Sequence, residues 1–109
     1  MLRSSPVPVF YPSMGRRDYI LHERRDAIRS TAVQYNARSI ALAGSVARRE
    51  DTSSSDVDFL VDFLPGTTLF DIAGLQIALE DMLGCHVDVV SVSGIRDRCQ
   101  GMLAEAIPL

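Results

Sequence analysis

Acidic and apolar residues alternate between Asp56 and Phe63, and this is the stretch of the chain best suited to chemistry. Every second residue from Val57 onward is large and apolar, which is typical of a half-buried β-strand. Because side chains alternate across a strand, Asp56 and Asp58 should project from one face, roughly 6–7 Å apart along the backbone. Like charges ~4 Å apart repel by about 4 kcal/mol at an effective dielectric of ~20. A divalent cation held by carboxylate oxygens would offset that repulsion.

A third acid, Asp88, interrupts a later apolar run over 85–92. If the two strands are parallel neighbours, ~4.8 Å apart, Asp88 reaches the same face as Asp56 and Asp58. Three carboxylates could hold two magnesium ions ~3.5–4 Å apart, a pair that clamps the attacking and leaving oxygens of a displacement at phosphorus. His86 shares the face of Asp88. A strand-edge histidine near phosphate or solvent is the simpler interpretation, and a metal-ligand or proton-relay role stays open.

The pair Gly44-Ser45 ends a short apolar run and precedes Asp56 by ten intervening residues. Glycine lets the backbone approach a phosphate, and the N–H groups that follow can donate to phosphate oxygens together with the Ser45 hydroxyl. Arg48 and Arg49 come next and could neutralise a polyphosphate. Alone, a Gly-Ser pair is an ordinary turn, an Asp-x-Asp pair is a solvated or capping feature, and a single strand acid lies at an edge. Their combination, in order and on separate elements, favours a site for metal and nucleotide.

The remaining pattern supplies the elements that position these residues. We expect, in order, a flexible lead-in over 1–15, an amphipathic helix over 16–36, a strand over 39–43, the acid-bearing strand over 56–64, a helix from 67 or 68 to 84, a strand over 85–92 and a last helix from 93. Together they predict one domain over 16–109 of the α/β class (α+β type). It would have a small mixed sheet of about three to four strands, helices on one face and the acidic face open.

Composition narrows the class of protein. The chain has 109 residues, 47% hydrophobic and 23% charged, which suits a single domain with an ordinary core. Its net charge of −3 argues against a nucleic-acid duplex as the main partner. Cys85 and Cys99 lack metal-type spacing, so we expect reduced thiols in a cytoplasmic protein. No apolar run approaches the ~20 residues of a membrane span, and Met1–Gly15 lacks the apolar stretch of a secretory signal.

The run GSVARREDTSSSDVDFLVDF, followed by a helix ending LEDMLG and the strand HVDVVSV, resembles the minimal nucleotidyltransferase family of the DNA polymerase beta superfamily. Gly-Ser, ten residues and then Asp-x-Asp is the signature of that superfamily, and the likeness runs from about Arg16 to the end. It implies a nucleotidyltransferase fold in which Asp56 and Asp58 bind both metal ions. Asp88 would serve the ion that activates the attacking hydroxyl.

The same resemblance assigns the phosphates to Gly44 and Ser45, with Arg48 assisting. This chain departs from the family at Arg49, where glycine is usual after the Ala-Arg pair. If that position needs a left-handed backbone, arginine costs ~1–2 kcal/mol there.

The resemblance also implies a function. Minimal nucleotidyltransferases of this size are similar to antitoxins that transfer AMP from ATP to a tyrosine of a helical HEPN-type ribonuclease toxin. We therefore expect a magnesium-dependent protein adenylyltransferase in a type VII-like toxin–antitoxin hetero-oligomer, with two Mg²⁺ ions and ATP. Two alternatives stay open: an antitoxin that acts by binding, with a vestigial nucleotide site, and a small-molecule nucleotidyltransferase.

Overall fold

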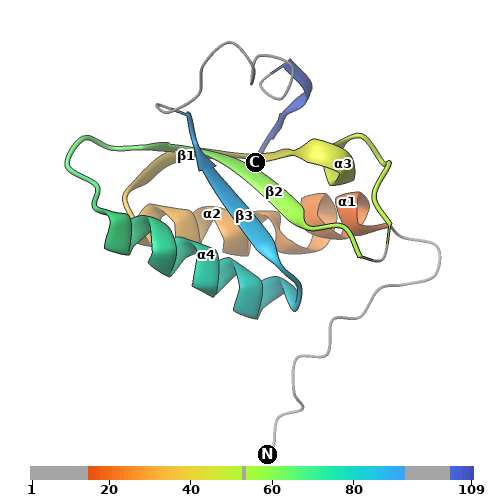
Figure 1. The fold of residues 1–109 in the computed structure, drawn as a ribbon, viewed down its shortest axis with the longest axis horizontal. Coiled ribbons are helices and arrows are strands. Elements are labelled where there is room, and N and C mark those ends of the chain that lie inside the picture. The colour runs from red at the N-terminus through yellow and green to blue at the C-terminus, as the bar shows by residue number, and fades with distance from the viewer. Residues whose placement is uncertain (1–14, 53, 93–103) are drawn as a thin grey trace, which may run out of the picture.

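A four-stranded mixed sheet with helices packed against it forms the fold (Figure 1). The structure is a computed structural model and describes residues 15–52, 54–92 and 104–109. Its elements are, in order, α1 (Arg16–Tyr19), the π-helical η1 (Ile20–Arg24), α2 (Arg25–Gln34), β1 (Ala37–Ala43), α3 (Gly44–Ala47), β2 (Val57–Phe63), α4 (Leu69–Leu83), β3 (Val87–Ser91) and β4 (Ile107–Pro108). The predicted lead-in lies almost wholly outside the described residues.

The strands lie in the order β3-β2-β1-β4. β1 is antiparallel to both β2 and β4, whereas β2 and β3 are parallel, which confirms the predicted mixed sheet. The short strand β4 was not predicted: Leu42 pairs with Ile107, and Arg25 Nη2 donates to the Pro108 carbonyl at 2.8 Å. The predicted last helix falls mainly on residues 93–103, outside the described ranges, and Cys99 falls there too.

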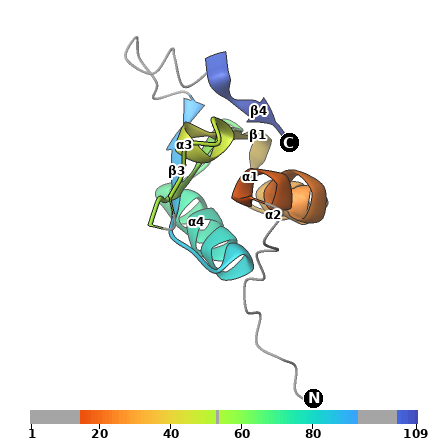
Figure 2. The same ribbon diagram turned by 90° about the vertical axis from the view of Figure 1, so that its right-hand side faces the viewer.

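Helices α1, α2 and α4 lie on one side of the sheet, as predicted, and α3 lies at the end of β1 (Figure 2). The single helix expected over 16–36 is a helical segment interrupted by η1. Its apolar side is buried as the periodicity indicated, through Tyr19, Ile20, Ile28 and Ala32. No helix of the described ranges is long and apolar enough to cross a membrane.

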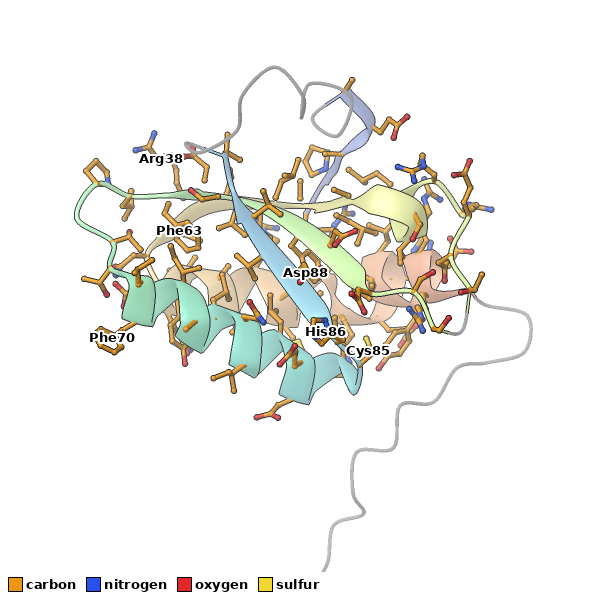
Figure 3. The ribbon with its side chains drawn as sticks, in the orientation of Figure 1. Arg38, Phe63, Phe70, Cys85, His86 and Asp88 are labelled. Atoms are coloured by element: carbon orange, nitrogen blue, oxygen red, sulfur yellow. The ribbon has the colours of Figure 1, made fainter. Side chains whose placement is uncertain are left out.

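Helix α4 connects the parallel strands and has the predicted ends. Thr68 caps it: the Thr68 hydroxyl accepts from the Asp71 N–H, and the Asp71 carboxylate accepts from the Thr68 N–H. Gly84 ends it in the left-handed conformation, with φ 69°. The buried residues of α4 are Leu75, Leu79 and Leu83. Leu69 is 81% exposed, and Phe70, which points away from the sheet in Figure 3, is 88% exposed.

The core fills the space between the helices and one face of the sheet. The alternation in β2 is confirmed, since Val57, Phe59 and Val61 are completely buried. Leu75 and Leu79 of α4 pack into the same hydrophobic cluster. Burying one large apolar side chain contributes roughly 1.5–3 kcal/mol, so this layer fixes β2 and leaves its acids on the opposite face.

Candidate functional site

The pairing of β2 with β3 places two of the predicted acids side by side. Asp58 is the register partner of Asp88 in the parallel ladder. Asp56 lies two residues before Asp58 and thus faces the same side of the sheet. The structure therefore brings Asp56, Asp58 and Asp88 together at the beginning of two neighbouring strands.

The three acids make an electrostatically strained site. Partial burial, followed by the negative charges of Asp88 and Asp56, raises the pKa of Asp58 above its ordinary value. Arg48 acts in the opposite direction, but it is the weakest of these influences. A site that disfavours its own negative charge is one that a divalent cation would stabilise.

His86 adds a nitrogen donor beside the carboxylates. Its Nδ1 lies 3.5 Å from Asp56 Oδ1, and Asp56, His86 and Asp88 each offer one ligand atom within 4.8 Å of the others. Figure 3 shows His86 and Asp88 in succession at the start of β3. Carboxylate oxygens suit Mg²⁺, so the donor set fits a divalent ion. The two-residue spacing of His86 from Asp88 is the sequence signal that leaves a metal-ligand role for His86 open.

Gly44 and Asp58 fit against each other. Gly44 has φ 71°, a left-handed conformation that side chains rarely adopt, and a Cβ built on it would lie 2.2 Å from Asp58 Oδ2. Position 44 therefore requires glycine for two reasons: its backbone is left-handed, and there is no room for a Cβ. Because no side chain caps α3, the backbone N–H groups of its first turn, at Gly44 and Ser45, remain suitable donors to an anion.

The two predicted phosphate-binding arginines diverge. Arg48 donates to Glu50 at 2.9 Å and to Glu105 at 3.1 Å, and these hydrogen bonds raise its pKa. Arg49 Nη2 instead lies 3.4 Å from Asp18 Oδ1 of α1. Arg49 also has φ 61°, so its backbone is left-handed, the case in which arginine is expected to cost ~1–2 kcal/mol.

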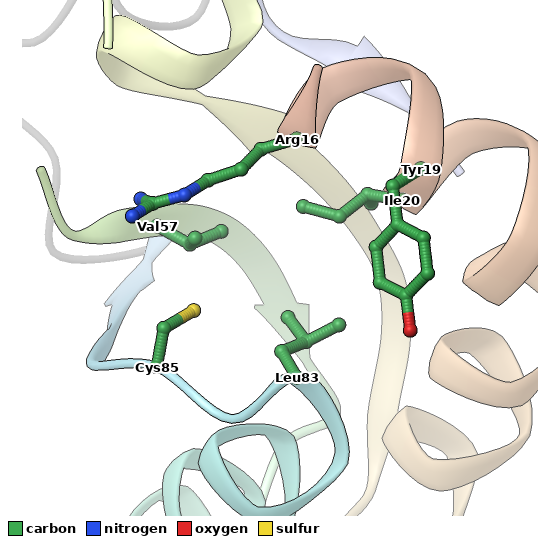
Figure 4. A pocket seen from close by; sticks show the side chains of 6 residues that line it. All are labelled: Arg16, Tyr19, Ile20, Val57, Leu83 and Cys85. Carbon is green, nitrogen blue, oxygen red and sulfur yellow. The ribbon is translucent and has the colours of Figure 1, made fainter. Parts of the chain in front are cut away.

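Arg16 anchors the loop that leads to Asp56. Its guanidinium donates to the Ser55 carbonyl and lies 3.9 Å from Asp51. In Figure 4 the side chain extends over Val57 and Cys85, at a mainly apolar cavity lined by Arg16, Tyr19, Ile20, Val57, Leu83 and Cys85. Cys85 is a free thiol whose pKa is raised by burial. We interpret this cavity as packing beneath the loop, apart from the acids.

Comparisons with known proteins agree with this geometry. The family described as the nucleotidyltransferase domain matches residues 25–107. A candidate protein adenylyltransferase of Methanocaldococcus jannaschii is 33% identical over 75 residues, which cover 69% of this chain and 81% of that protein. The protein adenylyltransferase MntA of Thermococcus cleftensis is 38% identical over 63 residues, 58% of this chain and 64% of MntA. The chain thus spans about two thirds of the length of several relatives, MntA among them.

Solved structures show the same fold. A candidate minimal nucleotidyltransferase superposes with a TM-score of 0.76 and 42% identity, covering 91% of this chain and all of that one. A toxin–antitoxin crystal structure with AMP-PNP superposes with a TM-score of 0.67 over 78% of this chain and 71% of that chain. At 19% identity, the second likeness concerns the fold alone.

Proposed function

The chain belongs to the nucleotidyltransferase domain family, and from this premise we propose that it is a magnesium-dependent protein adenylyltransferase. It would transfer AMP from ATP to a protein hydroxyl, with tyrosine as the expected acceptor. The observation that supports this most is the register of Asp58 with Asp88, because it gathers acids from two strands beside the Gly44 turn. The acceptor hydroxyl loses its proton to water and its oxygen forms a bond to the α-phosphorus. The bond from that phosphorus to the oxygen that bridges it to the β-phosphorus breaks, and pyrophosphate leaves.

Asp56, Asp58 and Asp88 would hold two Mg²⁺ ions. When bound, the ions stabilise negative charge on the α-phosphate and on the leaving pyrophosphate. The acids supply oxygen ligands from strands fixed by the core, so that little rearrangement is needed on binding. Partial burial of Asp58 lowers the local dielectric, which strengthens its attraction to a cation.

The turn at Gly44 would bind the triphosphate. The N–H groups of Gly44 and Ser45 supply neutral donors that the backbone already holds in place, and the Ser45 hydroxyl adds another. Arg48 would exchange its two glutamate partners for phosphate oxygens. Both the old and the new contacts are exposed, charge-assisted hydrogen bonds. Arg49 would contribute only if its contact with Asp18 opened.

The proposed acceptor lies on a partner protein, a HEPN-type ribonuclease toxin, which makes this chain its antitoxin. Support comes from the relative named protein adenylyltransferase MntA and from the fold likeness to toxin–antitoxin structures, one of them with AMP-PNP. Because ATP is the proposed donor, we expect the pair to act in the cytoplasm.

A second function is favoured by one observation. Arg48, the arginine expected to assist in phosphate binding, is instead occupied by Glu50 and Glu105. The chain could then be an antitoxin that inhibits its toxin by binding alone, with a vestigial nucleotide site.

Mass spectrometry of the co-expressed partner separates the two functions. We expect added AMP on the partner, dependent on ATP and Mg²⁺, and lost in Asp58→Asn. Asp62→Asn is the matched control, since Asp62 is an acid of the same strand that pairs with Arg38 at 3.8 Å instead. Inhibition of the toxin without added AMP would support the binding function and reject the transferase.

A further inference from the structure

His86 lies between two carboxylates at the start of β3. Its Nδ1 is 3.5 Å from Asp56 Oδ1, and its Nε2 is 3.9 Å from Glu80 Oε2 of α4. The His86 side chain is 60% exposed, so it is not required by the core. Because His86 lies beside Asp56 and Asp88, the two candidate metal ligands, it could bind the same ion.

The separation of the donors suits a shared ion. Two ligands that each lie ~2.1 Å from one metal ion in a tetrahedral arrangement are ~3.4 Å from each other. His86 Nδ1 and Asp56 Oδ1 are 3.5 Å apart, and the donor atoms of the whole group, including Asp88, are within 4.8 Å. Small rotations of the exposed Asp56 and His86 side chains would close the wider separation.

The backbone and α4 hold the ring in this place. The Val57 N–H donates to the His86 carbonyl at 3.0 Å, which fixes His86 at the entry to the β2–β3 ladder. The Glu80 carboxylate is itself held, because Oε2 accepts from the Val87 N–H at 3.2 Å. At 3.9 Å, Glu80 Oε2 is not hydrogen-bonded to His86 Nε2, but it lies on the side from which a carboxylate can support a metal-bound imidazole through its second nitrogen.

We propose that His86 Nδ1 is a third ligand of the ion that Asp56 and Asp88 share, and that Glu80 positions the ring. An imidazole donor favours borderline ions such as Co²⁺ and Zn²⁺, whereas Mg²⁺ prefers oxygen. One of the two metal positions would then bind borderline ions more tightly than Mg²⁺. The inference rests on the proposed function only in taking Asp56 and Asp88 to be metal ligands.

Co²⁺ binding to the isolated chain, without ATP or partner, tests this directly. In the proton NMR spectrum of the Co²⁺-loaded protein we expect a strongly shifted, exchangeable resonance from a coordinated imidazole. It should disappear in His86→Gln and persist in His22→Gln, the exposed histidine of η1. Co²⁺ affinity should fall by more than ~10-fold in His86→Gln and by roughly 10-fold in Glu80→Gln, which keeps the acceptor for Val87. Mg²⁺ affinity should stay nearly constant.

Failure here differs from failure of the transferase. Absence of the shifted resonance in the wild-type protein, or its persistence in His86→Gln, would overturn the ligand assignment even if the partner gains AMP. A shifted resonance that depends on His86 would uphold the assignment even if no AMP is transferred. An effect of His86→Gln on metal-free stability, with unchanged Co²⁺ affinity, would show that the ring is only an ion-pair partner of Asp56 and Glu80.

Discussion

The carboxylate of Asp58 occupies the space that a side chain on Gly44 would need. A Cβ at Gly44 would lie 2.2 Å from Asp58 Oδ2 and 3.0 Å from its Cγ, so the start of α3 and the beginning of β2 meet without room for a methyl group. The turn that we propose binds phosphate and an acid that we propose binds metal are therefore in direct contact, so a change in either must displace the other.

Gly44→Ala should therefore remove function as well as stability. Alanine in a left-handed backbone costs ~1–2 kcal/mol, and at Gly44 the clash with Asp58 is added. We expect Mg²⁺ and a nonhydrolysable ATP analogue to raise the melting temperature of the wild-type protein but not that of Gly44→Ala. Gly66→Ala is the control, because Gly66 has φ 90° but no atom within 4 Å of the place that an added methyl group would take. An equal ligand response from both variants would contradict the coupling.

Asp58→Asn should leave the metal-free protein at least as stable as the wild type at neutral pH. Burial and the nearby acids raise the pKa of Asp58, so its charged form opposes folding. The stability that Asp58 contributes is present below its ordinary pKa of 3.8 and is lost as the pH rises through the raised value. We expect urea denaturation in EDTA to show a free energy of unfolding that falls from acid to neutral pH in the wild type. The fall should be smaller in Asp58→Asn. Marked destabilisation of the variant at neutral pH would refute the account.

Arg49→Gly should stabilise the chain by up to about 1 kcal/mol. Glycine relieves the left-handed strain at φ 61°, and its greater freedom in the unfolded state cancels part of that gain. The exposed contact with Asp18 that is lost contributes little. Arg49→Lys keeps the charge and the strain, so its urea midpoint should match the wild type. Equal midpoints for all three proteins would mean that position 49 is not strained.

Arg16→Met should lower the free energy of unfolding by about 1–3 kcal/mol, because a charged, mostly buried donor to the Ser55 carbonyl is lost. Arg38→Met is the control: Arg38 also lies near an aspartate, at 3.8 Å, but its side chain is 56% exposed. That change should stay within about 0.5 kcal/mol. Equal effects of the two variants in urea denaturation would show that the anchor is no stronger than a surface ion pair.

The features predictable from sequence are those that depend on neighbouring residues. The alternation around Phe59 fixes which face of β2 is buried, and Thr68, Asp71 and Gly84 mark the ends of α4 through local hydrogen bonds and backbone conformation. The parallel pairing then follows from the crossover helix, and it brings Asp88 to Asp58.

The unpredicted features depend on residues distant in the chain. Strand β4 has two residues, one of them Pro108, and takes its form from pairing with β1, which no local pattern reveals. The partner of Arg48 at Glu105 lies 57 residues away. The contacts of His86 with Asp56 and Glu80 likewise join separate elements, and no local pattern reveals them.

The link between α4 and β3 has one further consequence. Only Cys85 and His86 separate the capping Gly84 from β3. Because strand residues alternate between faces, one inserted residue there would turn Asp88 inward and bring a valine outward in its place. The length of this connection therefore decides which face of the sheet Asp88 occupies. Inserting or deleting one residue there would remove Asp88 from the acidic site although every acidic residue stayed in the sequence.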